Sequence, residues 1–396
     1  MNDPHGIVFA DGCYHLFYQY VPHATEWKSD LSWGHATSTD LVHWNEVDVA
    51  LAPLPTEVGC WSGSVVLADQ PTMFYSRPSD EEWGRGMVVL VTGSEDLLEW
   101  QREAVVIPGP PSDEFFDFRD PQVRRDSDVW KLTIGAGWRG VGGCALQYSS
   151  MDLRTWEFDG VLASRSSEDI EPLESGTVWE CPQFLEVDGN WVLIVSAMDT
   201  DQANLAEVIY AVGDYDGKRF TPRAWGRFGH SRSVYATTTF RDASGAPCAM
   251  SWLRDFPRDA DQPWAGEQSL VHRLRVIDDR LVLEQHENFD AIVAAEDPAW
   301  RATIDIPEAS SGGFCVDVDD DDSGWSVVLD WDAAVMHVTV NDAVVYAADL
   351  RNDARAGVLD IVVDAGIAEI TWSGGEGIYV VMVPDIDPRS IDVTSW

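Results

Sequence analysis

The chain of 396 residues is 45% hydrophobic, which is enough to build the cores of one large or two ordinary domains. Its formal net charge of −42 disfavours nucleic acid and anionic membranes as partners, because both would be repelled, and favours a neutral substrate or a cation. No signal peptide precedes Asn2 and no apolar run reaches membrane-spanning length, so the sequence predicts a soluble, cytoplasmic protein.

The chain begins with Asn2-Asp3-Pro4-His5-Gly6, a pattern typical of a rigid turn at a strand end from which the carboxylate of Asp3 projects. Three further turns with polar side chains follow at intervals of about 60 residues. They are Trp61-Ser62-Gly63-Ser64, Phe118-Arg119-Asp120-Pro121 and Trp179-Glu180-Cys181-Pro182. The near-constant interval predicts that the four turns occupy equivalent positions in successive structural repeats.

A second pattern, S-x-D-L-x-x-W, begins at Ser38, Ser94 and Ser150, with starts 56 residues apart. Residues 213–220 contain a decayed fourth copy. Between the copies lie short apolar segments that alternate like strands, such as 12–20, 129–134 and 191–196, and Asp188-Gly189-Asn190 is typical of a hairpin turn. Four short strands fit in about 56 residues, the size of a propeller blade. The sequence therefore predicts a five-bladed β-propeller over residues 1–295, with the polar turns around one mouth of its central channel.

From about residue 298 the period is lost. Strand-like segments at 325–331, 335–340, 359–364, 368–372 and 378–383 are spaced as in an antiparallel sandwich. The acidic run 317–322 is predicted to be a solvated loop. The predicted fold is all-β, with a β-sandwich over residues 296–396.

Asp3, Asp120 and Glu180 are the carboxylates that open three of the predicted inner strands. Three acids converging on one channel are costly unless they are used, because like charges at close range cannot all ionise comfortably. Glycoside hydrolysis with retention needs one carboxylate as nucleophile and a second as acid and then base. A third carboxylate can bind sugar hydroxyl groups, so the three acids together indicate this chemistry.

At these motifs the chain resembles glycoside hydrolase family 32, the invertase, levanase and inulinase group, over nearly its whole length. Residues 2–6 resemble the family's N-D-P-N-G, and residues 33–38 match W-G-H-A-x-S. Residues 61–64, 118–121 and 179–182 are similar to F-S-G-S, F-R-D-P and W-E-C-P, in the same order. The resemblance implies a five-bladed propeller followed by a sandwich, and retaining cleavage of terminal β-linked fructosyl groups from sucrose, fructo-oligosaccharides or fructans.

Carried over by motif, the resemblance implies that Asp3 is the nucleophile, Glu180 the acid/base and Asp120 a transition-state stabiliser that binds fructose hydroxyl groups. Arg119 would hold Glu180 and the sugar by charge-assisted bonds, and Cys181 would tune Glu180. The implied substrate pocket also contains Asn2, Gln19, Trp27, Trp61, Ser62, Tyr235 and Trp264.

The sequence departs from the family pattern at His5 and Ser233, where the family has Asn and Asp. Neither departure removes a predicted catalytic carboxylate.

Two alternatives remain beside a hydrolase. One is a fructosyltransferase, in which a sugar hydroxyl group resolves the fructosyl-enzyme, and the other is a non-catalytic carbohydrate-binding propeller, which the presence of all three acids disfavours. The six cysteines lie far apart and indicate free thiols, and no residue spacing is typical of a metal or nucleotide site, so no cofactor is expected. The oligomeric state, including a homo-oligomer, and the preferred fructoside are left open.

Overall fold

The computed structural model describes residues 1–79, 84–200, 206–254, 265–291, 299–308, 311–319, 324–350, 356–384 and 390–396. Within these residues the regular structure is almost entirely β-strand, and the only helical segment is a short 3₁₀ helix, η1 (Glu287–Ala291). The predicted all-β class is therefore confirmed. No helix in the described part of the chain is long and apolar enough to cross a membrane.

Up to residue 285, the described residues form five antiparallel sheets, in which strands adjacent in the chain are in general adjacent in the sheet. The first sheet contains β1 (Pro4–Ala10), β2 (Cys13–Tyr20), β3 (Ser32–Ser38) and β4 (Asn45–Glu46). The second contains β5 (Gly63–Leu67), β6 (Pro71–Pro78), β7 (Gly86–Gly93) and β8 (Trp100–Ile107). The third contains β9 (Phe115–Asp126), β10 (Val129–Trp138), β11 (Gly142–Ser150) and β12 (Glu157–Ser164).

The fourth sheet contains β13 (Val178–Val187), β14 (Asn190–Met198), β15 (Ala206–Tyr215) and β16 (Phe220–Arg227). The fifth contains β17 (Val234–Arg241), β18 (Pro247–Leu253), β20 (His272–Ile277) and β21 (Arg280–Gln285), with the two-residue β19 (Glu267–Gln268) paired to β18. The strands predicted at 12–20, 129–134 and 191–196 are β2, β10 and β14, and the hairpin turn predicted at Asp188 and Gly189 joins β13 to β14.

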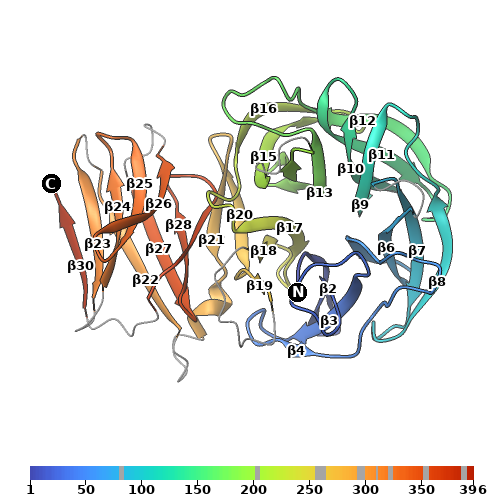
Figure 1. Ribbon diagram of the computed structural model, residues 1–396, viewed down its shortest axis with the longest axis horizontal. Helices are drawn as coiled ribbons and strands as arrows, with labels where there is room; N and C mark the ends of the chain where they lie inside the picture. Colours follow the sequence, from blue (N-terminus) through green and yellow to red (C-terminus); the bar gives the residue numbers. More distant parts are fainter. Residues whose placement is uncertain are drawn as a thin grey trace.

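The five sheets are arranged around a common centre, with β8, β12 and β16 at the outer rim (Figure 1). The first strand of each sheet contacts the first strand of the next, and β17 contacts β1, so these strands form a closed inner ring. Closure is reinforced by side chains: the Asn288 amide donates to the Asp40 carbonyl oxygen (2.9 Å), and the Ala243 N–H donates to the Tyr14 hydroxyl oxygen (2.9 Å). The fifth sheet is therefore joined to the first sheet, and this contact closes the ring.

The repeated S-x-D-L-x-x-W motif forms the turn between the third and fourth strands of a sheet. In the third copy, one carboxylate oxygen of Asp152 accepts the backbone N–H groups of Arg154 (2.8 Å) and Thr155 (2.7 Å). The intervening Leu153 is buried and has a positive φ of 64°, an unfavourable conformation that the Asp152 bonds stabilise. The corresponding buried leucines of the other copies also have positive φ: Leu41 and Leu97.

The decayed fourth copy forms the same turn. Asp216 accepts the N–H groups of Lys218 (2.9 Å) and Arg219 (2.8 Å), and Gly217, with φ of 94°, takes the place of the leucine. One turn geometry therefore recurs in four successive sheets, with the first three copies 56 residues apart and the aspartate of the fourth 64 residues after that of the third.

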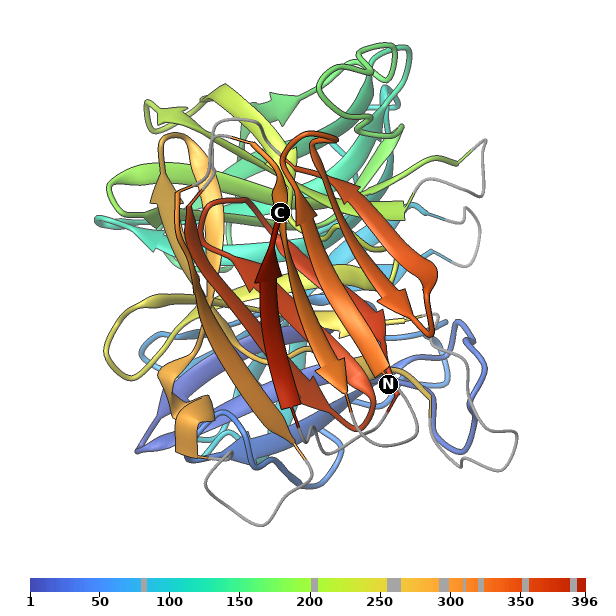
Figure 2. The same cartoon turned by 90° about the vertical axis from the view of Figure 1, so that its left-hand side faces the viewer.

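The remaining strands form two further antiparallel sheets. One has the order β22 (Trp300–Ile306), β27 (Gly357–Asp364), β28 (Ile367–Trp372) and β29 (Ile378–Met382). The other has the order β26 (Ala343–Asp349), β25 (Val335–Val340), β24 (Gly324–Asp330), β23 (Gly313–Asp319) and β30 (Ser390–Ser395). Figure 2 views the molecule from the side of these sheets. All five strands predicted here are present, and four were missed: β22, β23, β26 and β30.

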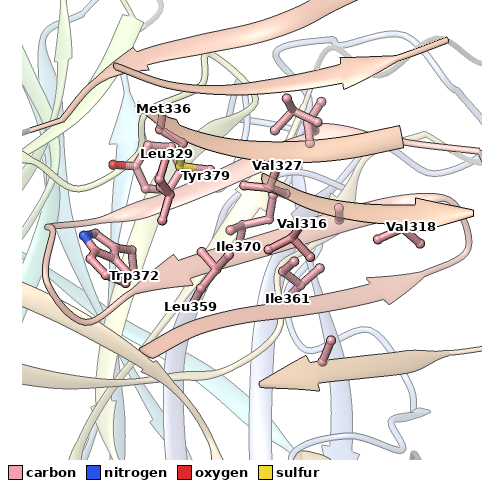
Figure 3. Close-up of a cluster of buried hydrophobic side chains, with 14 of the residues drawn as sticks. Val316, Val318, Val327, Leu329, Met336, Leu359, Ile361, Ile370, Trp372 and Tyr379 are labelled. Atoms are coloured by element: carbon pink, nitrogen blue, oxygen red, sulfur yellow. The ribbon is translucent and has the colours of Figure 1, made fainter. Parts of the chain in front are cut away.

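These two sheets share one hydrophobic cluster. Val316 and Val327 from one sheet and Ile361 and Ile370 from the other point into the space between them (Figure 3). The prediction of a solvated loop at 317–322 is wrong for residues 317–319, which lie in β23, because that strand is bordered by β24 and β30. Residues 320–322 lie outside the described residues, as does the predicted domain boundary at 295.

The two parts of the chain are joined by backbone hydrogen bonds. The N–H of His230 donates to the carbonyl oxygen of Ile378 (2.9 Å), and the N–H of Gly377 donates to that of Leu281 (3.2 Å). All six cysteines are described, and none forms a disulfide.

Candidate active site

The candidate site is built on the first strands of the sheets, where an irregularity recurs. In β9, β13 and β17 the pairing with the second strand is interrupted after Arg119, Glu180 and Tyr235, respectively. The residue that follows in each strand has a positive φ: Asp120 (62°), Cys181 (47°) and Ala236 (47°). Such a bulge bends a strand and redirects its side chains, and it places Arg119, Glu180 and Tyr235 at equivalent positions in three successive sheets.

Because these positions are adjacent around the inner ring, their side chains meet. Arg119 Nη1 donates to Glu180 Oε1 (2.8 Å), and the Tyr235 hydroxyl donates to Glu180 Oε2 (2.5 Å). Both oxygens of Glu180 are thus held, one by a cation and one by a phenol.

The bulges leave backbone N–H groups without partners in their own sheet. Side chains from the neighbouring sheet accept hydrogen bonds from these N–H groups. The N–H of Asp120 donates to Ser76 Oγ (2.6 Å), that of Cys181 to Asp120 Oδ2 (2.9 Å) and that of Ala236 to Ser196 Oγ (3.0 Å). Buried N–H groups require such partners. The same bonds fix the Asp120 carboxylate against the strand that carries Glu180.

Asp3 lies immediately before β1 and is oriented by a short relay of side chains. Ser62 Oγ donates to Asp3 Oδ2 (2.6 Å), and Gln19 Nε2 donates to Ser62 Oγ (2.7 Å). The Cys181 thiol lies 3.8 Å from Asp3 Oδ2 and 3.5 Å from Asp120 Oδ2. The thiol therefore lies between two of the three candidate acids.

The three acids open onto a pocket of about 200 Å³. Its lining consists of Asn2, Asp3, Gln19, Trp27, Leu31, Trp61, Arg119, Asp120, Glu180, Tyr235 and Trp252. A pocket with several aromatic walls and a few placed polar groups suits a sugar ring, which has both apolar faces and hydroxyl groups.

Nine of the twelve predicted site residues line this pocket. Two others, Ser62 and Cys181, contact Asp3 without lining the pocket, and Trp264 lies outside the described residues. Sequence reasoning missed Leu31 and Trp252. The second of these pairs with Tyr235 across β17 and β18, so alignment of the repeats could have indicated it.

Burial raises the pKa of both pocket aspartates, Asp3 and Asp120. It raises the pKa of Asp3 to about 6; the Ser62 hydrogen bond opposes this effect and the charge on Glu180 adds to it. Burial also raises the pKa of Asp120 to about 7, opposed by Arg119 and strengthened by Glu180.

For Arg119, burial acts to lower the pKa, but the carboxylates around it outweigh burial and hold its pKa above the usual range. Burial, followed by the charge on Glu180, holds the pKa of Tyr235 well above its usual value. Burial and the charges on Asp120 and Asp3 also raise the pKa of the Cys181 thiol. Arg119 is therefore charged at neutral pH, whereas the phenol and the thiol remain protonated and can donate hydrogen bonds.

The raised pKa of Asp3 predicts a stability cost that depends on pH. A carboxyl group with a pKa raised from 3.8 to about 6 favours the folded state below pH 3.8, and this contribution is lost as the pH rises through 6. Asp3→Asn removes the charge, so we expect the variant to be more stable than the wild type by roughly 1–3 kcal/mol at pH 8, with no difference from this source near pH 3.5. Urea unfolding at both pH values measures this. Asp113→Asn, at a 99% exposed side chain, is the control. An equal difference at both pH values would contradict the prediction.

The loop that leads into the second sheet is held by a partly buried cation from β8, Arg102. Arg102 Nη2 donates to the Ala52 carbonyl oxygen (2.7 Å) and lies 3.2 Å from both Cys60 Sγ and Glu57 Oε2. Arg102 Nε donates to the Tyr75 hydroxyl (3.0 Å), which donates to Glu57 Oε1 (2.7 Å). The side chain of Glu57 is only 2% exposed. This network fixes the segment directly before Trp61, which lines the pocket, and Ser62, which orients Asp3.

Arg102→Ala should destabilise the protein by about 3 kcal/mol, because it leaves the buried Glu57 carboxylate without its cation, although the Tyr75 and Leu54 hydrogen bonds remain. We also expect a higher KM, since the loop that supports the pocket loses its anchor. Arg154→Ala is the matched control, because the Arg154–Glu103 pair is 56% and 33% exposed and should contribute less than about 1 kcal/mol. Urea unfolding and steady-state kinetics measure the two effects. Equal losses in the two variants would show that burial of the network does not matter.

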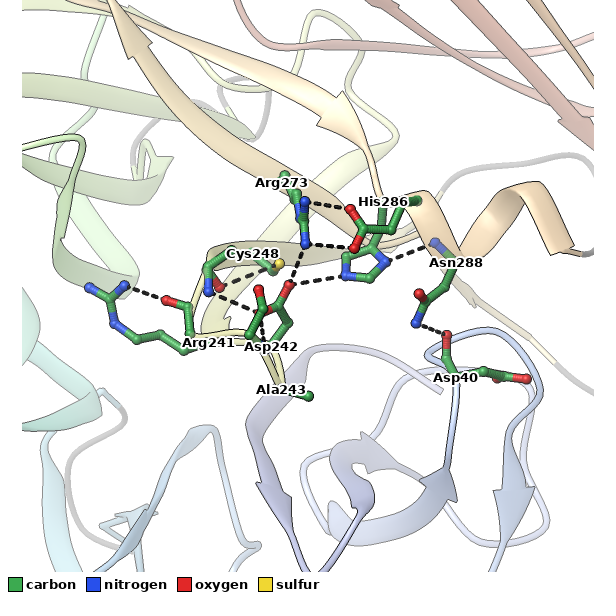
Figure 4. Close-up of polar contacts among 12 residues, drawn as sticks. Asp40, Arg241, Asp242, Ala243, Cys248, Arg273, His286 and Asn288 are labelled. Atoms are coloured by element: carbon green, nitrogen blue, oxygen red, sulfur yellow. Dashed lines mark hydrogen bonds and ion pairs between the residues drawn. The ribbon is translucent and has the colours of Figure 1, made fainter.

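One cluster outside the pocket has the composition of a metal site. Asp242, Cys248 and His286 lie together, but Asp242 Oδ2 already contacts Arg273 Nη2 (3.0 Å) and His286 Nε2 (3.2 Å) (Figure 4). His286 Nδ1 accepts the Asn288 N–H (3.2 Å), which places the ring proton on Nε2 and leaves no ring lone pair facing the cluster. The contacts indicate a structural network that ties β18, β20 and η1 together.

A larger cavity, of about 770 Å³, lies between β16, the loop that follows it, and β26. Its described lining contains none of the three candidate acids. Arg223 pairs with Asp214 and with Asp279 (2.8 Å), and Arg227 pairs with Glu207. Arg223 and Arg227 are thus engaged by carboxylates, whereas the three candidate acids line the smaller pocket.

Comparison with known proteins identifies a family whose model matches this chain. Residues 1–286 match the family model described as the glycosyl hydrolases family 32 N-terminal domain. A sucrose-6-phosphate hydrolase of Zymomonas mobilis is 32% identical over 339 residues, which cover 78% of this chain and 65% of that protein.

Solved structures extend the likeness to the whole chain. A sucrose-6-phosphate hydrolase from Lactobacillus gasseri superposes on 100% of this chain and 88% of its own, with a TM-score of 0.76 and 25% identity. A β-fructofuranosidase from Bombyx mori superposes on the same shares with a TM-score of 0.78 and 23% identity, which supports the fold. The chain spans less than two thirds of the length of the Zymomonas relative.

Proposed function

The chain belongs to glycoside hydrolase family 32, and on that premise we propose that it is a retaining glycoside hydrolase that releases terminal β-D-fructosyl residues. The substrates are sucrose, fructo-oligosaccharides or fructans, in keeping with relatives named levanase and fructan 6-exohydrolase. The observation that carries the proposal is the convergence of Asp3, Asp120 and Glu180 on one pocket with aromatic walls.

In this proposal Asp3 attacks the anomeric carbon of the fructosyl group. Its carboxylate is oriented by the Ser62 hydroxyl and is largely ionised above its pKa of about 6. Glu180, held by Arg119 and Tyr235, gives its proton to the leaving oxygen and then takes one from water. Asp120 accepts hydrogen bonds from hydroxyl groups of the fructosyl ring. These bonds become stronger as positive charge develops on the ring in the transition state.

We also propose that the five sheets of residues 1–285 are the five blades of a β-propeller and that the two later sheets form a β-sandwich domain. The closed ring of first strands and the single hydrophobic cluster between the last two sheets support this interpretation. The domain boundary is proposed near residue 295.

The test is the release of free fructose from sucrose, a short fructo-oligosaccharide, inulin and levan, with glucose measured in parallel for sucrose. Equal amounts of fructose and glucose would support hydrolysis, whereas glucose in excess of fructose would indicate transfer to another sugar. Release of fructose from none of the four by a folded protein would overturn the proposed activity.

A further inference from the structure

A fourth carboxylate shares the guanidinium group that holds Glu180. Arg119 Nη1 donates to Glu180 Oε1 (2.8 Å), while Arg119 Nη2 donates to Asp117 Oδ1. The three side chains are each 12–14% exposed, so solvent screens this row of charges only weakly. Arg119 therefore divides its attraction between two acids.

Asp117 is closely confined. It has a positive φ of 49° on β9, and the N–H of the next residue, Phe118, donates to the Gly84 carbonyl oxygen (2.8 Å). A Cβ atom on Gly84 would lie 2.3 Å from Asp117 Oδ1, so only glycine leaves room for this carboxylate. On another side of Arg119 the Trp61 ring packs with its centroid 4.5 Å from Cζ. The guanidinium is thus held by Asp117, Glu180 and an indole.

The other charged and titratable groups that face Glu180 come from three further elements. Asp3 precedes β1, Asp120 lies beside Arg119 on β9, and Cys181 follows Glu180 on β13. Tyr235 approaches from β17, and its ring is covered by Arg254 with Cζ 4.0 Å from the centroid. Arg119 is a cation in direct contact with Glu180. The attraction between Arg119 and Glu180 therefore depends on how far Asp117 neutralises the guanidinium group.

Building on the proposed function, we propose that Asp117 is a positioning residue for Glu180. It holds the Arg119 guanidinium in place and offsets part of its attraction for the Glu180 carboxylate. A nearby like charge disfavours the ionised form of an acid, and a nearby opposite charge favours it. With Asp117 present, the Glu180 carboxylate is attracted less strongly by Arg119 than it would be by an unshared guanidinium.

Asp117→Asn tests this proposal, because it preserves the shape and one acceptor oxygen for Arg119 but removes the charge. The wild-type kcat/KM profile for sucrose should be bell-shaped, with an acidic limb between about pH 6 and 7 from ionisation of Asp3 and Asp120 and a basic limb from the general acid. In the variant the basic limb should move to lower pH by about one unit. At pH values below the basic limb, kcat/KM of the variant for sucrose should be less than about tenfold lower than that of the wild type.

An aryl β-fructoside whose leaving group needs no proton provides the second readout. Above the shifted limb, Asp117→Asn should lose activity on sucrose while retaining most of its activity on the aryl substrate. Asp113→Asn is the matched control, because Asp113 precedes the same strand, is 99% exposed and approaches Arg85 only at 3.7 Å. It should leave both profiles unchanged. An unmoved basic limb in Asp117→Asn, or equal losses on both substrates at every pH, would overturn the proposal.

The failure of this inference is distinguishable from that of the proposed function. If the wild type released no fructose, the activity would be rejected, and the inference would be decided by carbon-13 NMR titration of Glu180, assigned with Glu180→Gln. A Glu180 proton lost at lower pH in Asp117→Asn than in the wild type would support the inference. Loss at the same pH in both proteins would overturn it.

Discussion

Asp3→Ala is expected to lower kcat for sucrose by roughly 10⁴-fold or more while leaving the fold intact. The carboxylate lies before β1, so its loss removes the Ser62 and Cys181 side-chain contacts but no backbone hydrogen bond of a sheet. What is lost is the group that we propose forms the covalent bond to the fructosyl carbon, and water in its place is neither oriented by Ser62 nor comparably nucleophilic.

Initial rates with sucrose, together with near-ultraviolet circular dichroism and Tm, measure this effect and the integrity of the fold. Ser62→Ala is the control, because it removes the hydroxyl that orients Asp3 but keeps the carboxylate, and it should cost about 10–100-fold. Activity of Asp3→Ala within tenfold of the wild type would rule out Asp3 as the nucleophile.

Glu180→Gln should suppress sucrose cleavage by about 10³-fold and affect an activated aryl fructoside far less in its first step. The amide is nearly isosteric: its oxygen can accept from Arg119 and its NH2 group can donate to the Tyr235 hydroxyl oxygen, so the pocket should keep its shape. It has no proton to give to the departing glucose oxygen, which leaves poorly without one.

The burst of aryl leaving group and the steady-state rate on sucrose separate the two steps. The basic limb of the pH profile should also disappear from the burst rate, since its titrating group is gone. Tyr235→Phe is the companion variant: it removes one hydrogen bond to Glu180 but keeps the acid, so we expect a loss of roughly tenfold on sucrose. Equal losses on both substrates in Glu180→Gln would argue against its role as the acid.

The parts of the fold that could be predicted are those in which a local signal repeats. The S-x-D-L-x-x-W copies specify one turn, because the aspartate bonds to N–H groups only two and three residues ahead. Asp188-Gly189 likewise specifies its hairpin through its own backbone preference. The strands missed in the last part of the chain, such as β22 and β26, are recognised only by the strands beside them.

The candidate site also contains residues that could be predicted from the sequence and residues that could not. Asp3, Asp120 and Glu180 were predicted because each lies in a short motif at a repeated interval. Asp117, Arg102 and Trp252 carry no such motif. Arg102 and Trp252 meet partners from distant segments or another strand, whereas Asp117 meets Arg119, two residues ahead on the same strand. The role of Arg102 in holding the loop that begins near Ala52 depends on contacts across 50 residues.

The sequence by itself determined the all-β class and the four repeated turns and predicted the three candidate acids, because these follow from short motifs and from the intervals between them. The tertiary structure decided which groups touch. Bulges in β9, β13 and β17 bring Arg119, Glu180 and Tyr235 into one row, and closure of the inner ring places Asp3 beside them. Burial then raises the pKa of Asp3 to about 6 and that of Asp120 to about 7. Neither the contacts nor the burial is encoded locally, because both arise when segments about 60 residues apart pack around one centre.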